Sequence, residues 1–211
     1  MNLQQIKHVL YSVLAFLMLG FGISLQIKAG IGLSMFNAFS LLLADLCTAE
    51  VGTLVNVLNL LFLAAYLIMK HSPISRHDII LITATIMNGY VINFFTYALL
   101  GSFVINAYPL RLLVFFIGLL LASLSLGIIL AMGIIQFPLE GLCIQIGQRL
   151  GYSLATVRMG FDVFFLLGTL SLTLLSSHTL YIREGTVISF LLFSRLLGLS
   201  YTYCQKHRQK T

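Results

Sequence analysis

The sequence predicts an all-α, polytopic membrane helix bundle with six spanning helices and two shorter, re-entrant half helices. Of the 211 residues, 59% are hydrophobic and only 9% are charged, whereas an ordinary soluble domain carries about 25% charged residues. The mean hydropathy is +1.02. The net charge of +6 does not indicate nucleic-acid binding, because the basic residues stand at the ends of apolar runs and form no single patch. These observations exclude a soluble enzyme, a disordered chain and a nucleic-acid-binding protein.

Six stretches reach the roughly 20 apolar residues that a spanning helix needs. They are residues 8–27, 51–69, 79–100, 111–133, 154–175 and 185–204. The first has the shape of a signal peptide, but it lacks an A-x-A cleavage site and further apolar stretches follow. We therefore interpret it as a retained first helix.

Two apolar stretches, 34–47 and 138–150, are too short to cross a membrane. A helix of about 14 residues covers about 21 Å, and the hydrocarbon core is about 30 Å thick. Each follows a break, with glycines in 29–32 and a proline in 136–138. Ser34 suits the N-cap and Pro138 the first helical turn. Stretches of this length are usually re-entrant, interfacial or buried, and we expect re-entrant half helices here.

The order long, short, long, long occurs twice and predicts an internal repeat. We expect one integral membrane domain over 1–211, with repeat 1 at about 8–100, repeat 2 at about 111–204 and a basic tail at 205–211. Because each repeat holds three spanning helices, the second is inverted if the short helices do not cross, which is a known transporter plan. If they did cross, the chain would have eight spans and a parallel repeat.

The alignment of the two halves places polar residues in corresponding positions. An offset of 103 residues lays Asn37 on Glu140 and Asn59 on Asp162. It also lays Phe62 on Phe165. Identities are few, and the shared order of segment lengths carries most of the argument for a repeat.

The distribution of lysine and arginine predicts the orientation. With both termini in the cytoplasm, seven basic residues lie inside and three outside. The inner ones are Lys7, Lys70, Arg76, Arg149, Lys206, Arg208 and Lys210, and the outer ones are Lys28, Arg111 and Arg183. The basic tail is expected to bind anionic lipid.

Segments 20–34, 51–53 and 184–189 resemble the bacterial YczE/YyaS/YitT membrane proteins, and the likeness extends from about residue 10 to 203. Members of that family have a Pro-Trp-Asp-like element after the first glycine break. Here that position reads Met-Phe-Asn and ends at Asn37, whereas its counterpart Pro-Leu-Glu, ending at Glu140, keeps the proline and the acid. The resemblance implies a protein of the bacterial cytoplasmic (inner) membrane, for which transport is the usual expectation.

Four ionisable residues fall inside apolar segments: Glu140, Arg158, Asp162 and Arg195. Such groups are costly in a membrane and are functional candidates by default. Asp162 and Arg195 share a depth of about 12 Å, and Arg158 precedes Asp162 by one helical turn. We therefore predict that Asp162 pairs with Arg158 or Arg195. The alternatives are that the pair only locks helices together and that Arg158 reaches water along its own length.

Glu140 begins a short helix, where it could complement the helix dipole or face a cavity and carry a proton or contact a cation. The first half offers amides instead, namely Asn37, Asn56, Asn59, Asn88 and Asn93. Amides can hydrogen-bond a solute or hold helices together. The expected solute-binding set is Glu140, Arg158, Asp162, Arg195, Asn37 and Asn59.

No enzyme constellation occurs in the sequence. It has no GxSxG, no HExxH and no paired catalytic carboxylates in one segment. The cysteines Cys47, Cys143 and Cys204 lie far apart without metal-ligand spacing. We therefore expect no catalytic residues, no metal and no cofactor.

The sequence thus favours a small secondary transporter, or one half of a homodimeric one, for a small polar or amphoteric organic solute. Its site would lie between the two repeats. The alternative is a membrane protein that does not transport but regulates or assembles another protein. A transporter needs a water-accessible cavity at the charged residues, whereas a scaffold would keep these groups sealed and paired.

Overall fold

The structure is a computed structural model that describes residues 3–70, 76–135, 137–176 and 182–208. These residues form helices and connecting segments, with no strand among them. The elements are α1 (Leu3–Ala29), α2 (Met35–Leu46), α3 (Val51–Lys70), α4 (Arg76–Asn93), the π-helical turn η1 (Phe94–Leu99), α5 (Tyr108–Met132), α6 (Pro138–Leu150), α7 (Leu154–Ser176) and α8 (Glu184–Arg208). Gln136 of the second break and residues 209–211 of the basic tail lie outside this description.

Six of these helices are long and apolar enough to cross a membrane, and they begin and end close to the predicted stretches. The two short helices, α2 and α6, also lie where the sequence places them. The predicted all-α fold class is therefore confirmed. Its long apolar helices are those of a multi-pass membrane protein.

The first break in the chain depends on two glycines. Gly30 and Gly32 have φ angles of +64° and +143°, which side chains with a Cβ rarely adopt. At Gly32 an added Cβ would lie 2.2 Å from the backbone nitrogen of Thr186 at the start of α8. Ser34 is the N-cap residue of α2, as predicted, and its carbonyl accepts a bond from Ala38, but its side chain makes no capping bond.

Contacts between connecting segments define the two ends of the bundle. At one end Lys28 donates to the carbonyl of Gly101, and Arg183 to that of Gly30. We call it the Tyr108 end, after the first residue of α5. At the opposite end, the Arg149 end, Arg149 donates to the carbonyl of Met69.

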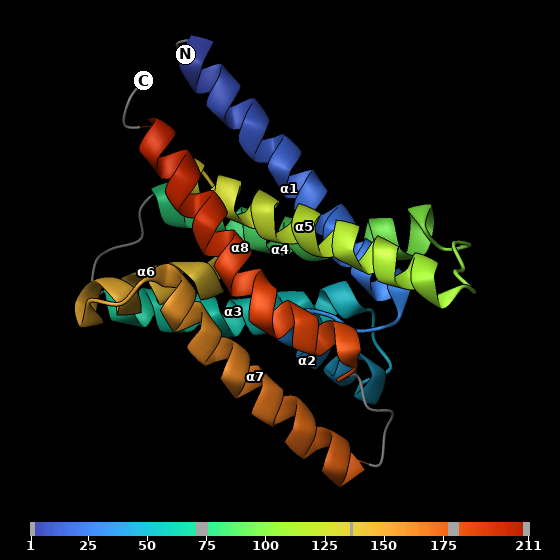
Figure 1. The fold of residues 1–211 in the computed structure, drawn as a ribbon. Helices are drawn as coiled ribbons and strands as arrows, with labels where there is room; N and C mark the ends of the chain where they lie inside the picture. Colours follow the sequence, from blue (N-terminus) through green and yellow to red (C-terminus); the bar gives the residue numbers. More distant parts are fainter. Residues whose placement is uncertain (1–2, 71–75, 136, 177–181, 209–211) are drawn as a thin grey trace.

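Each short helix belongs to a chain segment that begins and finishes at the same end of the bundle. The chain leaves α1 and enters α3 at the Tyr108 end, where the first residue of α3, Val51, donates its N–H to the Tyr97 hydroxyl of η1. The segment that holds α2 therefore begins and finishes there. The segment that holds α6 does the same at the Arg149 end, between α5 and α7. Figure 1 shows α2 and α6 at opposite ends of the bundle.

The helices pack in a reciprocal pattern. α5 contacts α1 and α8, α2 packs on α3 and α7, and α6 packs on the same two helices (Figure 1). Small residues permit the close crossing of α1 and α5, because a Cβ at Gly118 would lie 2.6 Å from the carbonyl oxygen of Gly22. Phe36 of α2 meets Phe165 of α7 and Phe62 of α3, at ring-centre distances of 5.3 and 6.4 Å.

Two of the amides fix α3 against α4. Asn93 accepts the N–H of Gly52, and Asn56 accepts the N–H of Gly89, at 2.8 and 3.1 Å. Asn93 also donates to Glu50. These partners are backbone groups and a side chain of the neighbouring segment, so Asn56 and Asn93 hold helices together instead of facing a solute.

Candidate functional site

All eight α-helices contribute to one polar cavity of about 40 Å³ in the interior. A space of that size holds about two or three water molecules. The residues that line it are Leu19 and Ile23 of α1, Phe36 and Asn37 of α2 with the preceding Ser34, Asn59 of α3, Asn88 of α4, Leu126 of α5, Leu139 and Glu140 of α6 with the preceding Phe137, Arg158 of α7 and Phe193 of α8. The first turns of both short helices thus meet there.

A buried ion pair forms one wall of the cavity. Nη1 of Arg158 donates to Oε1 of Glu140 at 2.9 Å, and the two side chains are 3% and 6% exposed. A charge buried to this degree is very costly without a partner of opposite charge. Glu140 and Arg158 are therefore expected to stay paired with each other. The structure also excludes the alternative that Arg158 reaches water at the membrane surface.

Asp162 lies behind Arg158 and completes the charged cluster. Its Oδ1 is 3.6 Å from Nε of Arg158, one turn earlier on α7. The hydroxyl of Ser194 on α8 donates to its Oδ2 at 2.7 Å. Of the two arginines predicted as partners of Asp162, Arg158 is the one that lies next to it in the structure. One guanidinium therefore faces two carboxylates, and it also lies 5.7 Å from the ring centre of Phe193.

Some polar atoms of this region have no hydrogen-bond partner among the described residues. Oδ1 of Asn88, Nε of Arg158 and Oδ1 of Asp162 are such atoms, although the last two approach each other as an ion pair. Asn88 is 5% exposed and lines the cavity. Its free amide oxygen can accept a hydrogen bond from a water molecule or from a polar solute in the cavity.

The predicted binding residues therefore divide into two groups. Asn37, Asn59, Glu140 and Arg158 line the same cavity, and Asp162 contacts Arg158 from behind. Arg195 does not join them. It lies on the exposed side of α8, in a groove next to the start of α7.

Three further groups near the site lie outside the predicted binding set. Asn88 is one of five candidate amides in the first half of the sequence, and nothing in the sequence indicates Phe193 or Ser194. Ser194 immediately precedes Arg195, so α8 carries the partner of Asp162 beside the arginine that was proposed for that role. A serine or phenylalanine in an apolar helix carries no signal in a single sequence, because either is common there.

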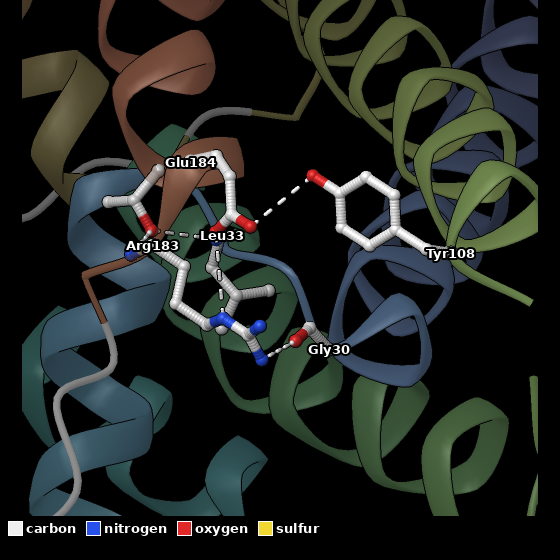
Figure 2. A network of polar contacts seen from close by, with 6 residues as sticks. Gly30, Leu33, Tyr108, Arg183 and Glu184 are labelled. Carbon is white, nitrogen blue, oxygen red and sulfur yellow. Dashed lines mark hydrogen bonds and ion pairs between the residues drawn. The ribbon is translucent and has the colours of Figure 1, made fainter. Parts of the chain in front are cut away.

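At the Tyr108 end, a second polar network ties the first break to α8 (Figure 2). Nη1 of Arg183 donates to the carbonyl of Gly30 at 2.7 Å, and Tyr108 donates to Glu184 at 3.3 Å. The backbone N–H of Leu33 donates to the hydroxyl of Thr186 at 3.3 Å. In Figure 2 the hydroxyl of Tyr108 points toward Glu184 at the start of α8, and the side chain of Arg183 extends toward Gly30. The network fixes the segment that leads into the first turn of α2, and so positions Asn37.

Nothing in the described segments resembles a metal centre. Across residues 3–70, 76–135, 137–176 and 182–208, no three histidine, cysteine, aspartate or glutamate side chains gather closely enough to hold an ion. The side chains that line the cavity offer hydrogen bonding and charge pairing.

The fold and cavity define a multi-pass helical membrane protein with a buried, ion-paired polar centre. The chain belongs to DUF6198, a family of unknown function whose model matches residues 6–202. Comparison with curated proteins and with solved structures finds no significant match.

Proposed function

We propose that this protein is a small secondary transporter for a small polar or amphoteric organic solute. The observation that carries the proposal is the cavity where the first turns of α2 and α6 meet. Half helices that end inside a bundle are how many transporters build a site near the middle of the membrane. The driving force would be a gradient or a partner protein, since the sequence has no nucleotide-binding motif.

The side chains around the cavity suit a solute that carries both kinds of polar group. Glu140 can contact a cationic group or carry a proton, and Arg158 can contact an anionic one. Asn37 and Asn59 add donors and acceptors without a charge. Asp162 balances Arg158 from outside the cavity, which leaves the arginine held in place when Glu140 turns to a solute.

An inverted repeat is part of this proposal. It is supported by the reciprocal packing, in which α2 contacts α7 and α6 contacts α3. It is also supported by Asn37 and Glu140, which correspond in the alignment and both line the cavity. Phe62 and Phe165 correspond as well, and their rings lie 5.9 Å apart, as expected for residues close to a pseudo-two-fold axis. Transport would then be rocking of one repeat against the other.

The cavity is too small for an organic solute in this conformation. A volume of about 40 Å³ leaves room for only a few water molecules, so binding of an organic solute would need the helices to separate at one end. The network of Arg183, Glu184 and Tyr108 at the Tyr108 end is a contact that such an opening would break.

The same small volume favours one other function. A protein that regulates or assembles a partner would keep Glu140, Arg158 and Asp162 sealed and paired, with no opening at either end. Solute binding and access from water distinguish the two functions.

For the location, we propose the bacterial cytoplasmic membrane with both termini in the cytoplasm. The positions of the basic residues support this orientation. Lys28, Arg111 and Arg183 are near the Tyr108 end. The helix ends at the Arg149 end carry more of them, namely Lys70, Arg76, Arg149, Lys206 and Arg208. A homodimer stays part of the proposal, although one chain already supplies all the residues that line the cavity.

A ligand screen by thermal unfolding tests the proposal. Purified protein in detergent is heated with amino acids, vitamins, nucleosides, organic anions and amines. A ligand at one hundred times its dissociation constant stabilises the folded state by about 2.7 kcal/mol. A stabilising compound whose effect disappears in Glu140→Gln, but persists in Arg195→Gln, would support the cavity as the site. A compound that stabilises the wild type and Glu140→Gln equally would contradict it.

A further inference from the structure

Arg195 lies on the exposed side of a helix that crosses the membrane. The apolar span of α8 runs over Glu184–Lys206, and Arg195 is exposed about halfway along it. All six acidic residues of the chain are in the described part, and no ion pair joins any of them to Arg195. A cation facing lipid without a counter-charge is costly, so an anion must come from outside the chain.

The surroundings of Arg195 provide a place for that anion. Arg195 lies in a groove of about 550 Å³ between the start of α7 and the second half of α8. Ser153, Tyr201 and Thr202 line the groove beside apolar side chains. The Tyr201 hydroxyl accepts a bond from Gln205 and can still donate, whereas Thr202 already donates to the carbonyl of Gly198. Hydroxyl and guanidinium groups are the usual protein partners of a phosphate group.

The depth of Arg195 selects a lipid as the source of the phosphate. A Cβ at Gly198 would lie 3.0 Å from Cβ of Ala155, so Gly198 is level with the first turn of α7. Arg195 precedes Gly198 by three residues, which is about 4.5 Å along the helix. Arg195 is therefore about 4.5 Å deeper than the first turn of α7. Its side chain is long enough to bring the guanidinium up to the start of α7, where that helix meets the level of the lipid headgroups.

We propose that the groove around Arg195 binds the phosphate of an anionic phospholipid, with the acyl chains along the apolar surface of α7 and α8. The site is separate from the central cavity and does not depend on transport. Arg195 therefore serves as a lipid ligand and is not part of a solute site. The exposed Lys206, nearer the end of α8, adds only general attraction to an anionic surface.

Native mass spectrometry of the purified protein in neutral detergent tests this site. The probes are phosphatidylglycerol, phosphatidylcholine and inorganic phosphate, and the variants are Arg195→Gln, Arg195→Lys and Lys206→Gln. One basic group near the surface contributes about 1 kcal/mol, so we expect Arg195→Gln to weaken phosphatidylglycerol binding about fivefold. Arg195→Lys should keep most of it, and Lys206→Gln should bind like the wild type.

Two results would overturn the proposal. One is unchanged phosphatidylglycerol binding by Arg195→Gln. The other is inorganic phosphate binding as tightly as the lipid and in an Arg195-dependent way, since this would indicate a site for a soluble anion. Arg195→Gln removes a charge from a lipid-facing helix, so the variant should fold, and its thermal unfolding without lipid checks this.

Discussion

Arg158 of α7 and Glu140 of α6 form a hydrogen-bonded ion pair of 2.9 Å at the wall of the central cavity. The pair joins the long helix α7 to the first turn of the short helix α6. Because Asp162 also faces Arg158, the single guanidinium is the only described cation in the cluster. The arrangement makes Arg158 the residue on which the cluster depends.

Replacing Arg158 should therefore destabilise the protein more than replacing either acid. Arg158→Met leaves two carboxylates buried without a cation, which costs about 3–5 kcal/mol. Glu140→Gln and Asp162→Asn each leave the arginine with one acidic partner and should cost less. Thermal unfolding in detergent gives the order of the three variants.

The triple variant Arg158→Met, Glu140→Gln, Asp162→Asn is the control for this prediction. Removing all three charges should restore part of the stability that Arg158→Met loses, because no uncompensated charge stays buried. If Arg158→Met were as stable as Glu140→Gln, the ion pairs would not form as described.

Ser194, which directly precedes Arg195, should contribute to the stability of the protein through its bond to Asp162. Ser194→Ala removes the hydrogen bond to buried Asp162 and should cost about 1–3 kcal/mol. Ser123→Ala is a matched control, because Ser123 is also buried in a helix but bonds the carbonyl of Leu119 one turn earlier. Its loss should cost under about 1 kcal/mol. Equal unfolding temperatures for the two variants would argue against the bond to Asp162.

The contact between α3 and α4 should not tolerate a methyl group. A Cβ at Gly89 would lie 2.3 Å from the carbonyl oxygen of Gly52, so Gly89→Ala should cost about 1–3 kcal/mol through displaced helices. At Gly160 of α7 a Cβ meets nothing within 4 Å. Gly160→Ala should be neutral or stabilising by up to about 1 kcal/mol. Chemical or thermal unfolding of both variants measures the difference, and a tolerated Gly89→Ala would contradict the close packing.

In the first glycine break, alanine should be tolerated less well at Gly32 than at Gly30. Gly30 and Gly32 both have positive φ, and alanine at either costs about 1–3 kcal/mol for the backbone alone. Only at Gly32 does a Cβ also collide with the backbone of Thr186. Gly32→Ala should therefore unfold at a clearly lower temperature than Gly30→Ala. The reverse order would show that the break does not pack on α8.

The sequence alone was sufficient to predict the helices, because length and apolar composition decide which segments can span a membrane. It also predicted that α2 and α6 are short, and it singled out four of the cavity residues: Asn37, Asn59, Glu140 and Arg158. Charged groups and amides are rare in apolar segments, so they are visible in one sequence.

What the sequence could not predict was the rotation of each helix. Arg195 and Asp162 were matched by depth, but depth does not determine which side of α8 faces inward. Ser194, one residue earlier, takes the inward position and contacts Asp162, whereas Arg195 points to the groove. Since adjacent helical residues differ by about 100° around the axis, a shift of one residue separates a buried partner from an exposed cation.

Access of water to the cavity is the measurement that tests the proposed transport most directly. In a variant without Cys47, Cys143 and Cys204, a cysteine replaces Asn59, and a membrane-impermeant thiol reagent is applied from each side of oriented vesicles. Ala38→Cys is the buried control, since Ala38 is fully buried beside Asn37 and does not line the cavity. Tyr152→Cys is the exposed control at the Arg149 end.

Alternating access predicts that the cysteine at position 59 reacts from both sides, more slowly than the exposed control and faster than the buried one. Reaction from neither side, with the exposed control fully labelled, would contradict transport. The central cluster would then serve to hold the helices of a regulatory or assembly protein together.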